Sequence, residues 1–319
     1  MNWRPKVDSI PRLVPSLDLV HRVTDVATAY TIARMRTLES IPGNPIGIAY
    51  RTQDNAVALM ARHLPSPSFN SVVGLRRGQA DHIRTLVEWY REHGVAGRFE
   101  IASGDDDPAL GRELARLGYF ESGCHAALIG EPDLDVSAPS EIAVEQVTSA
   151  EQMEEFLGAY VVGWGIPEPA HDQFKKNVRP WLGQPGWSLY LARAEGRAAA
   201  TATLFIRGGV GYFADSATDP AFRGHGLHMA LLRRRTQDAS AAGVHFVCSG
   251  ADFLSTSHRN MERVGMRLLF LRSIWTHLDC TSSPRGGYSR IRGSARVRSQ
   301  LGGRNSQYRQ MQDLRRADR

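Results

Sequence analysis

The sequence predicts a mixed α/β protein of the α+β kind, built from two similar halves. Its 319 residues exceed the length of one ordinary domain, so two domains with separate cores are expected. Residues 76–129 and 223–278 share one order of long helix, strand, short helix and strand. Glycines follow the long and the short helix of each half, and these are Gly94, Gly118, Gly243 and Gly265. A repeat on this scale indicates duplication of one fold.

We place the domains at 1–135 and 142–280, with a linker at 136–141 and a tail at 281–319. The linker lies in GEPDLDVSAPSEIAVEQV, which is proline-rich, acidic and without periodicity. The tail has ten arginines, no lysine and two aspartates, which gives it a net charge of +8 within a chain total of +6. Its polar composition predicts a disordered basic extension. The alternatives are an arm that binds polyanions nonspecifically and a short helix that docks on a partner.

Composition excludes several classes of protein. No apolar run approaches 18 residues, and the N-terminus has scattered charges and prolines where a signal peptide needs an apolar stretch. Three cysteines, Cys124, Cys248 and Cys280, are too few and too scattered for a disulfide framework or a thiolate metal site. We therefore expect a soluble, cytoplasmic protein without a metal, without a membrane partner, and with nucleic-acid contact only through the tail.

Local sequence patterns predict the order of helices and strands in the second half. Ser149 and the glutamates after it predict the start of a helix, and a second helix follows Pro169. Apolar alternation on both sides of a turn at 195–197 predicts a hairpin over 187–209, and VGYFADSAT (210–218) is a third strand. A helix to about Ala242, the strand VHFVCS, a short helix capped near Ser255 or Ser257, and a final strand over 266–278 complete this half.

The loop in DPAFRGHGLHMALLRRR (219–235) predicts an anion site. Gly224 and Gly226 let the backbone approach a ligand, and the following helix directs free amides and its positive dipole end at that ligand. A diphosphate suits this arrangement, with Arg223 adding charge. The arginines at 233–235 are expected on a solvated helix face. The spacing lacks the third small residue of a dinucleotide fingerprint and the Gly-Lys-Ser/Thr of a P-loop.

Residues 142–278 resemble the GCN5-related N-acetyltransferase (GNAT) family. SATDPAFRGHGLHMALL matches the family's strand end, proline and Arg/Gln-x-x-Gly-x-Gly/Ala opening a helix, and STSHRNMERVGMRLLF resembles its closing helix, glycine and strand. The whole chain resembles tandem members with a degenerate N-terminal copy. The resemblance implies two GNAT-like domains, each with a central mixed, mostly antiparallel sheet flanked by helices.

The resemblance also implies acetyl-CoA as cosubstrate, with its pyrophosphate held by loop amides. The implied cofactor-binding positions are Ala217, Thr218, Arg223, Gly224, His225, Gly226, Leu227 and His228. The amide of Ala217 or Thr218 would polarise the thioester carbonyl. His228 departs from the small residue that the family prefers, and it could crowd the diphosphate. On the residues alone, His225 and His228 are exposed imidazoles or phosphate contacts, and neither has metal-ligand spacing.

Three side chains are catalytic candidates: Asp215, Ser257 and Asn260. Alternation places Asp215 on one face with Phe213 and Ala217, where it is either the base for the attacking amine or a residue that shapes the acceptor pocket. Met261 stands where many family members have the tyrosine that protonates the leaving thiolate. Ser257 or Asn260 would then bond the sulfur or the pantetheine, and Ser257 has the alternative role of helix cap.

The first half lacks the phosphate loop. The matching residues read VVGLRRGQADHIRTL (72–86), without the glycine pattern, so no tight coenzyme A binding is expected there. Residues 66–75 are its expected core strand. Arg76 and Arg77 either contact an anion or, in the favoured interpretation, have a structural role or cover the substrate.

Two function classes follow. The first is an N-acetyltransferase (acyltransferase) that moves an acetyl group from acetyl-CoA to the amine of a small molecule by direct attack in a ternary complex. Its acceptor is an amino sugar, an antibiotic, or an amino-acid or thiol conjugate. Glu168, His171 and Asp172 either bind this acceptor or face solvent. The alternative is a catalytically silent acyl-CoA-binding regulatory module whose basic tail contacts a partner. The intact loop and Asp215 favour the enzyme, as a monomer or a homodimer.

Overall fold

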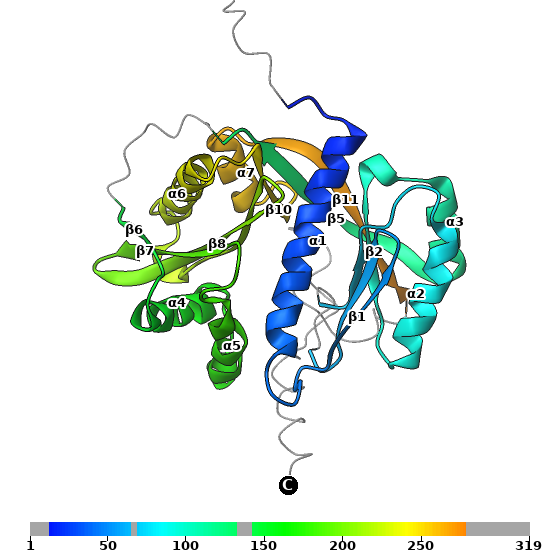
Figure 1. The fold of residues 1–319 in the computed structure, drawn as a ribbon, viewed down its shortest axis with the longest axis horizontal. Coiled ribbons are helices and arrows are strands. Elements are labelled where there is room, and N and C mark those ends of the chain that lie inside the picture. Colours follow the sequence, from blue (N-terminus) through cyan, green and yellow to red (C-terminus); the bar gives the residue numbers. More distant parts are fainter. Residues whose placement is uncertain (1–12, 65–68, 133–141, 279–319) are drawn as a thin grey trace, which may run out of the picture.

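The computed structural model describes residues 13–64, 69–132 and 142–278, and the predicted α/β fold is confirmed (Figure 1). The predicted linker at 136–141 and tail at 281–319 lie outside these residues. None of the helices in the described ranges is long and apolar enough to cross a membrane.

The elements of the first half begin with a long helix that the sequence analysis did not identify. They are α1 (Leu17–Glu39), β1 (Ile48–Gln53), β2 (Ala56–Ala61), β3 (Ser71–Val73), α2 (Ala80–Glu92), β4 (Arg98–Ala102), the 3₁₀ turn η2 (Ser103–Asp105), α3 (Pro108–Arg116) and β5 (Tyr119–Gly130). The β1–β2 hairpin is also new, whereas α2 to β5 follow the predicted order.

The elements of the second half follow the prediction closely, with an added edge strand β6. They are β6 (Val144–Gln146), α4 (Ala150–Gly163), η3 (Glu168–Ala170), α5 (His171–Val178), η4 (Arg179–Trp181), β7 (Trp187–Ala194), β8 (Arg197–Arg207), β9 (Val210–Thr218), η5 (Pro220–Phe222), α6 (Leu227–Ala241), β10 (Phe246–Asp252), α7 (Thr256–Arg263) and β11 (Arg267–His277). Ser149 caps α4 as predicted, because its hydroxyl accepts the Gln152 amide at 3.2 Å.

All described strands form one sheet of eleven strands, in the order β1-β2-β3-β4-β11-β5-β10-β9-β8-β7-β6. The last strand of each half lies between strands of the other half. β11 pairs with β4 and β5, and β5 pairs with β10 and β11, all antiparallel. The two halves are therefore joined through exchanged strands at the centre of the sheet (Figure 1).

Cutting the chain between residues 136 and 141 should leave the two halves associated, because separation would break strand pairs on both sides of β5 and β11. A specific protease site inserted there, followed by cleavage and size-exclusion chromatography, tests this. We expect the fragments to co-elute in native buffer and to separate only in denaturant. Separate elution in native buffer would contradict the exchanged arrangement.

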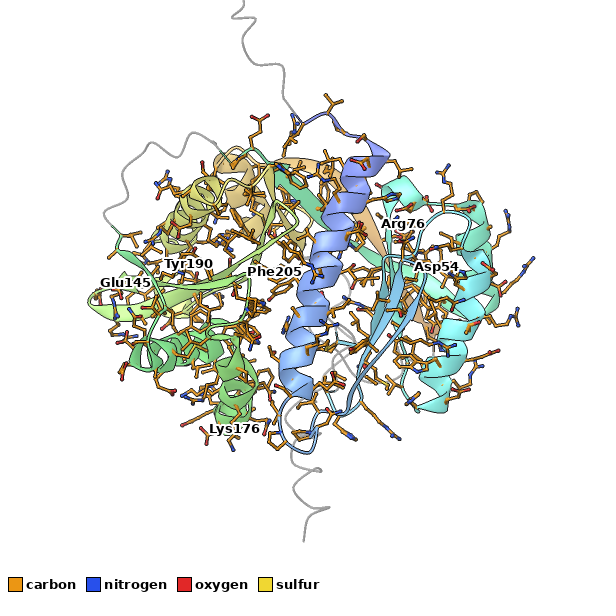
Figure 2. All side chains as sticks on the ribbon, viewed as in Figure 1. Asp54, Arg76, Glu145, Lys176, Tyr190 and Phe205 are labelled. Carbon is orange, nitrogen blue, oxygen red and sulfur yellow. The ribbon has the colours of Figure 1, made fainter. Side chains whose placement is uncertain are left out.

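Helices cover both faces of the sheet. Leu204 and Phe213 pack with α6, whereas Phe205 and Tyr212, one position along, pack with α1. Figure 2 labels Phe205 beside α1, where its ring meets Tyr30 with centroids 5.6 Å apart. α4 and α5 share the face of α1, since they pack on odd-numbered residues of β7. This face brings the first half's helix next to the second half's strands.

The parallel strands β9 and β10 are paired over only part of their length. Their pairs run from Val210 with Phe246 to Phe213 with Ser249. Beyond Ser249, β10 pairs on its other side with β5, while β9 continues to Thr218 beside β8. The two strands thus separate towards their C-terminal ends, and β9 leads from that point into the predicted loop.

Candidate functional site

The loop after β9 presents backbone amides that have no acceptor in the described part of the chain. Gly224 and Gly226 have φ of +87° and +83°, and Gly226 is the N-cap of α6. The amide of Ala230 donates to Gly226 at 3.0 Å, but no described residue accepts from the amides of Gly224 to Met229. No other atom lies within 4 Å of a Cβ placed on Gly224. Free amides at the start of a fifteen-residue helix form an anion site, so the loop fits a diphosphate.

Arg223 fixes this loop to its surroundings. Its Nε donates to the Thr218 carbonyl at 3.3 Å, and another guanidinium nitrogen donates to Gly163 at the end of α4 at 3.4 Å. A Cβ on Gly163 would lie 2.9 Å from the Cβ of Ala217, so α4 packs directly on the end of β9. The candidate positions Ala217 and Thr218 are therefore held between α4 and the loop.

Asp215 does not share a face with Phe213, which corrects the prediction from alternation. The register of β8 against β9 shifts between Thr201 and Thr203, and Asp215 has a φ of +45°. This is a β-bulge, and the extra residue interrupts the period of two. Phe213 packs towards α6, whereas the Asp215 carboxylate meets Arg34 of α1 on the opposite face.

The Asp215 side chain is only 7% exposed, and its Oδ1 lies 3.7 Å from a guanidinium nitrogen of Arg34. Burial raises the pKa of Asp215 to about 7, although the nearby positive charge of Arg235 opposes the rise. Its Oδ2 has no hydrogen-bond partner among the described residues. A buried carboxyl that changes protonation near neutral pH is suited to accept a proton from a substrate.

Arg235 holds the bulge, which corrects the expectation that it lies on a solvated helix face. It is 1% exposed, and its guanidinium donates to the carbonyls of Thr203 and Ala214 at 3.1 and 3.4 Å. These two residues form the pair next to the register shift. Its carbon Cζ lies 4.6 Å from the centre of the Phe213 ring. Arg235 therefore satisfies carbonyl groups at the point where the strand ladder is interrupted.

His228 contacts α7, whereas the sequence suggested an exposed imidazole. Its Nδ1 lies 3.1 Å from the amide nitrogen of Asn260, whose oxygen accepts from Arg263 at 2.7 Å. Burial lowers the pKa of His228 to about 3, and Arg235 adds to that effect, so the ring is neutral. His225 is exposed as expected. The bulky ring at position 228 thus has a place against α7.

The remaining catalytic candidates lie on α7. Ser255 caps this helix by accepting the His258 amide at 3.2 Å, so Ser257 is not the cap. The Ser257 hydroxyl makes no hydrogen bond to another described residue, and the side chain is half-buried. Met261 is buried in the core with α6 residues. Asn260 is thus brought to the loop through His228, and Ser257 lies beside it on the same helix.

The other acceptor candidates are on the short helices after α4. Glu168 and Asp172 are exposed, and His171 bonds the Ile166 carbonyl at 2.8 Å. Arg34 is the site residue that the sequence analysis missed. It has no motif, and it comes near Asp215 only because α1 crosses the sheet.

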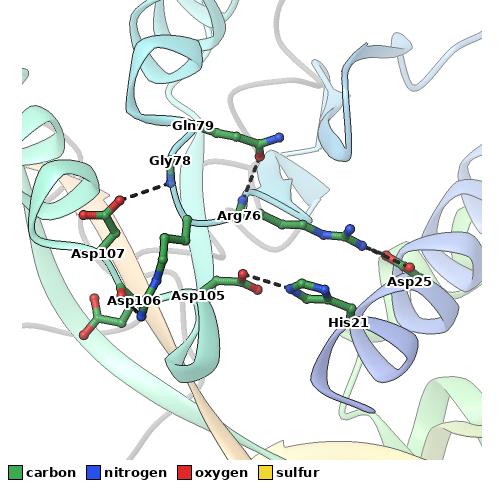
Figure 3. A network of polar contacts seen from close by, with 9 residues as sticks. His21, Asp25, Arg76, Gly78, Gln79, Asp105, Asp106 and Asp107 are labelled. Atoms are coloured by element: carbon green, nitrogen blue, oxygen red, sulfur yellow. Dashed lines mark hydrogen bonds and ion pairs between the residues drawn. The ribbon is translucent and has the colours of Figure 1, made fainter. Parts of the chain in front are cut away.

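The loop before α2 in the first half also has a glycine with positive φ, but the amide of this glycine is bonded to another group of the protein. Gly78 has a φ of +83°, as Gly226 does, and lies just before α2. Its amide donates to Asp107 Oδ2 at 3.1 Å (Figure 3). Asp107 Oδ1 also accepts the Ala109 amide at 2.9 Å. A carboxylate of the protein thus occupies the place of an external anion.

The two arginines of this loop are also engaged internally. Arg76 donates to both carboxylate oxygens of Asp25 at 2.9 and 3.1 Å, and its backbone amide donates to Gln79 (Figure 3). Arg77 donates to the Asp106 carbonyl at 3.0 Å. These contacts agree with the structural role that the sequence favours for both residues.

Residues 136–253 match the family model described as "Acetyltransferase (GNAT) domain". The chain contains a GNAT domain. Acyl transfer is the general activity of this family, and the predicted resemblance of the second half to the family is confirmed. No curated protein matches the chain in sequence.

Solved structures with the GNAT fold resemble most of the chain. A GCN5-related N-acetyltransferase from Kribbella flavida has a TM-score of 0.57 at 18% identity, covering 79% of this chain and 96% of that one. One from Sphaerobacter thermophilus has a TM-score of 0.53 at 17% identity, covering 80% and 90%. A tandem GNAT protein from the clavulanic acid pathway has a TM-score of 0.53 at 14% identity, covering 81% and 93%. The fold, including the first half, is therefore shared with whole GNAT proteins.

Proposed function

We propose that the protein is an N-acetyltransferase that moves the acetyl group of acetyl-CoA to the amine of a small molecule by direct attack in a ternary complex. The observation that carries this proposal is Asp215, a buried carboxyl with a pKa near 7 in the bulge of β9, three residues before the strand ends. The same strand leads into a loop of free amides. A base and a diphosphate site on one connected segment are what acyl transfer to an amine requires.

The loop from Arg223 to His228 binds the diphosphate in this proposal. The glycines keep the backbone open, and the free amides from Gly224 onwards donate hydrogen bonds to phosphate oxygens. Acetyl-CoA supplies the acyl group as a thioester, already activated for attack by the amine. The amide of Ala217 or Thr218 at the end of β9 polarises the acyl carbonyl.

Asp215 takes one proton from the attacking nitrogen. Its carboxylate form is available at neutral pH because its pKa lies near 7, and it is more basic than an exposed aspartate. The unpaired Oδ2 is the atom free to accept that proton. Ser257 and Asn260 are proposed to hydrogen-bond the departing sulfur, which needs little help because a thiolate is a good leaving group.

Release of free thiol from acetyl-CoA, measured with a panel of amino sugars, amino acids and simple amines, tests the proposal. We expect release that depends on one class of amine and saturates with it. Calorimetry of acetyl-CoA binding accompanies the assay. Binding without turnover of any amine would favour the silent acyl-CoA-binding module, for which the buried Met261 and the bulky His228 are the supporting features.

A further inference from the structure

We propose that the acceptor amine carries a carboxylate, which Arg34 of the first half binds while Asp215 receives the proton of the amine. This inference rests on the proposed function, because it names the acceptor class of the same site. The acceptor is then an amino acid or a short peptide.

Arg34 is held in position without a hydrogen bond to its guanidinium. The Cζ atom lies 4.7 Å from the centre of the Phe69 ring and 5.5 Å from the centre of the Trp181 ring. Asp215 Oδ1 lies 3.7 Å from a guanidinium nitrogen of Arg34, which is beyond hydrogen-bond distance. Among the described residues, no acceptor satisfies the five N–H groups of this side chain, which is 24% exposed. Two aromatic rings orient a cation whose donors remain available.

Other unpaired polar groups lie on the same face of the sheet as Arg34. Asp215 Oδ2, the Tyr30 hydroxyl and the Trp181 indole N–H are buried, and none has a partner in the described part of the chain. The hydroxyls of Thr201 and Thr203 are also unpaired, and these residues alternate along β8 with alanines that pack towards α6. All five groups thus lie on the face of the sheet that α1 covers. Buried polar groups in native proteins are nearly always paired, so this concentration indicates a polar ligand.

The charges favour a ligand with both signs. A carboxylate matches the fork of the Arg34 guanidinium with two parallel hydrogen bonds. An ammonium group close to that carboxylate faces Asp215, which lies 3.7 Å from Arg34. An acceptor with amines alone would bring a second positive charge towards Arg34, which has only Asp215 as a nearby carboxylate within the described ranges. An amino acid satisfies both groups, whereas a polyamine or an amino sugar satisfies one.

The transfer step conserves atoms and charge. The acceptor ammonium gives one proton to Asp215 and becomes the neutral amine, whose nitrogen forms the new bond to the acyl carbon. The carbon–sulfur bond of acetyl-CoA breaks, and a second proton passes from the nitrogen to the departing sulfur, so coenzyme A leaves as the thiol. The carboxylate of the acceptor stays on Arg34 and is unchanged. Arg34 is therefore a specificity residue, and the first half supplies recognition through α1 while the second half supplies the chemistry.

Steady-state kinetics of the full chain with matched acceptors test this inference. The acceptors are standard amino acids, their carboxamides, in which the charge is absent, and dipeptides, whose carboxylate lies further from the amine. We expect wild-type kcat/KM to be roughly 10- to 100-fold higher for an acid than for its amide, consistent with a charged hydrogen-bonded contact. A higher kcat/KM for free amino acids or for dipeptides identifies which of the two classes is the acceptor.

Arg34→Gln should remove that preference, because KM should rise far more for the acids than for the amides, while the affinity for acetyl-CoA stays close to wild type. Arg36→Gln, an exposed arginine on the same helix, is the matched control and should change neither. Thermal melts show whether the variants fold. Equal use of acids and amides by the wild type, or an equal loss on both in Arg34→Gln, would overturn the inference while amine-dependent turnover still supported the proposed function. Absence of turnover with every amine would instead reject the proposed function, and this inference with it.

Discussion

Asp215→Asn should lower kcat by about 100- to 10,000-fold, the range for loss of a general base. Asparagine has nearly the same shape, so it can occupy the bulge, but its amide cannot accept the proton of the attacking nitrogen. The wild-type rate should rise with pH through about 7 as the buried carboxyl ionises, and the variant should lose that rise. Rate measurements from pH 5 to 9 with saturating substrates check both results. Asp81→Asn, at an exposed aspartate on α2, is the control. A variant with wild-type kcat would remove Asp215 from the mechanism.

The same variant should be more stable than the wild type above pH 7. The pKa of Asp215 is raised from 3.8 to about 7 in the folded protein, so folding favours its protonated form. This contribution to stability is fully present below pH 3.8 and is lost as pH rises through 7. Asparagine has no such dependence. The difference in Tm between variant and wild type should therefore grow between pH 5 and pH 8, whereas a constant difference would indicate an ordinary carboxyl. Higher stability with lower activity would mark Asp215 as a residue retained for function.

Local sequence signals predicted much of the second half. The hairpin over 187–209 and the loop at 219–235 depend on alternation, turn glycines and a helix start, all of which are encoded within a few residues. Gly224 and Gly226 have the positive φ values that the predicted loop requires. The family resemblance then followed from the order of these elements. Short-range patterns are therefore enough to predict a glycine loop before α6.

The sequence singled out Asp215 as a candidate base, but it did not predict the orientation of this side chain. Period-two alternation assumes an uninterrupted strand, and the bulge at Asp215 turns its side chain to the face of α1. No residue pattern in VGYFADSAT predicts that bulge. The carbonyls that the bulge exposes are satisfied by Arg235, which the sequence places in a run of three arginines that reads as a solvated surface.

Contacts between the halves were beyond sequence analysis of one chain. α1 has no motif, and Arg34 reaches Asp215 across a separation of 181 positions. The exchange of β5 and β11 is equally non-local, because either strand would be compatible with pairing inside its own half. In the first half the closed loop depends on Asp107, which lies 29 residues beyond Gly78. The sequence therefore predicted the glycine loop and its free amides, but not the contacts that α1 makes with the second half.

Arg235→Met should destabilise the fold by about 3–5 kcal/mol. Burial lowers the pKa of Arg235 to about 9, so its charge is held at a cost that methionine would remove. The opposing effect is larger, because the carbonyls of Thr203 and Ala214 would each lose a donor in the core, at about 1–3 kcal/mol per unsatisfied group.

Urea denaturation of Arg235→Met measures this loss, with Arg233→Met, at a half-buried arginine of the same helix, as the matched control. We expect the control to stay within about 1 kcal/mol of the wild type, because Arg233 makes no ion pair or hydrogen bond through its side chain to a described residue. Equal stability of the two variants would mean that the bulge carbonyls find other donors. Loss of Arg235 also removes the positive charge that restrains the pKa of Asp215, so the pH at which the rate rises should move upward in any folded variant. A shift of that kind would link the buried arginine to the reactivity of the base through the geometry of one strand.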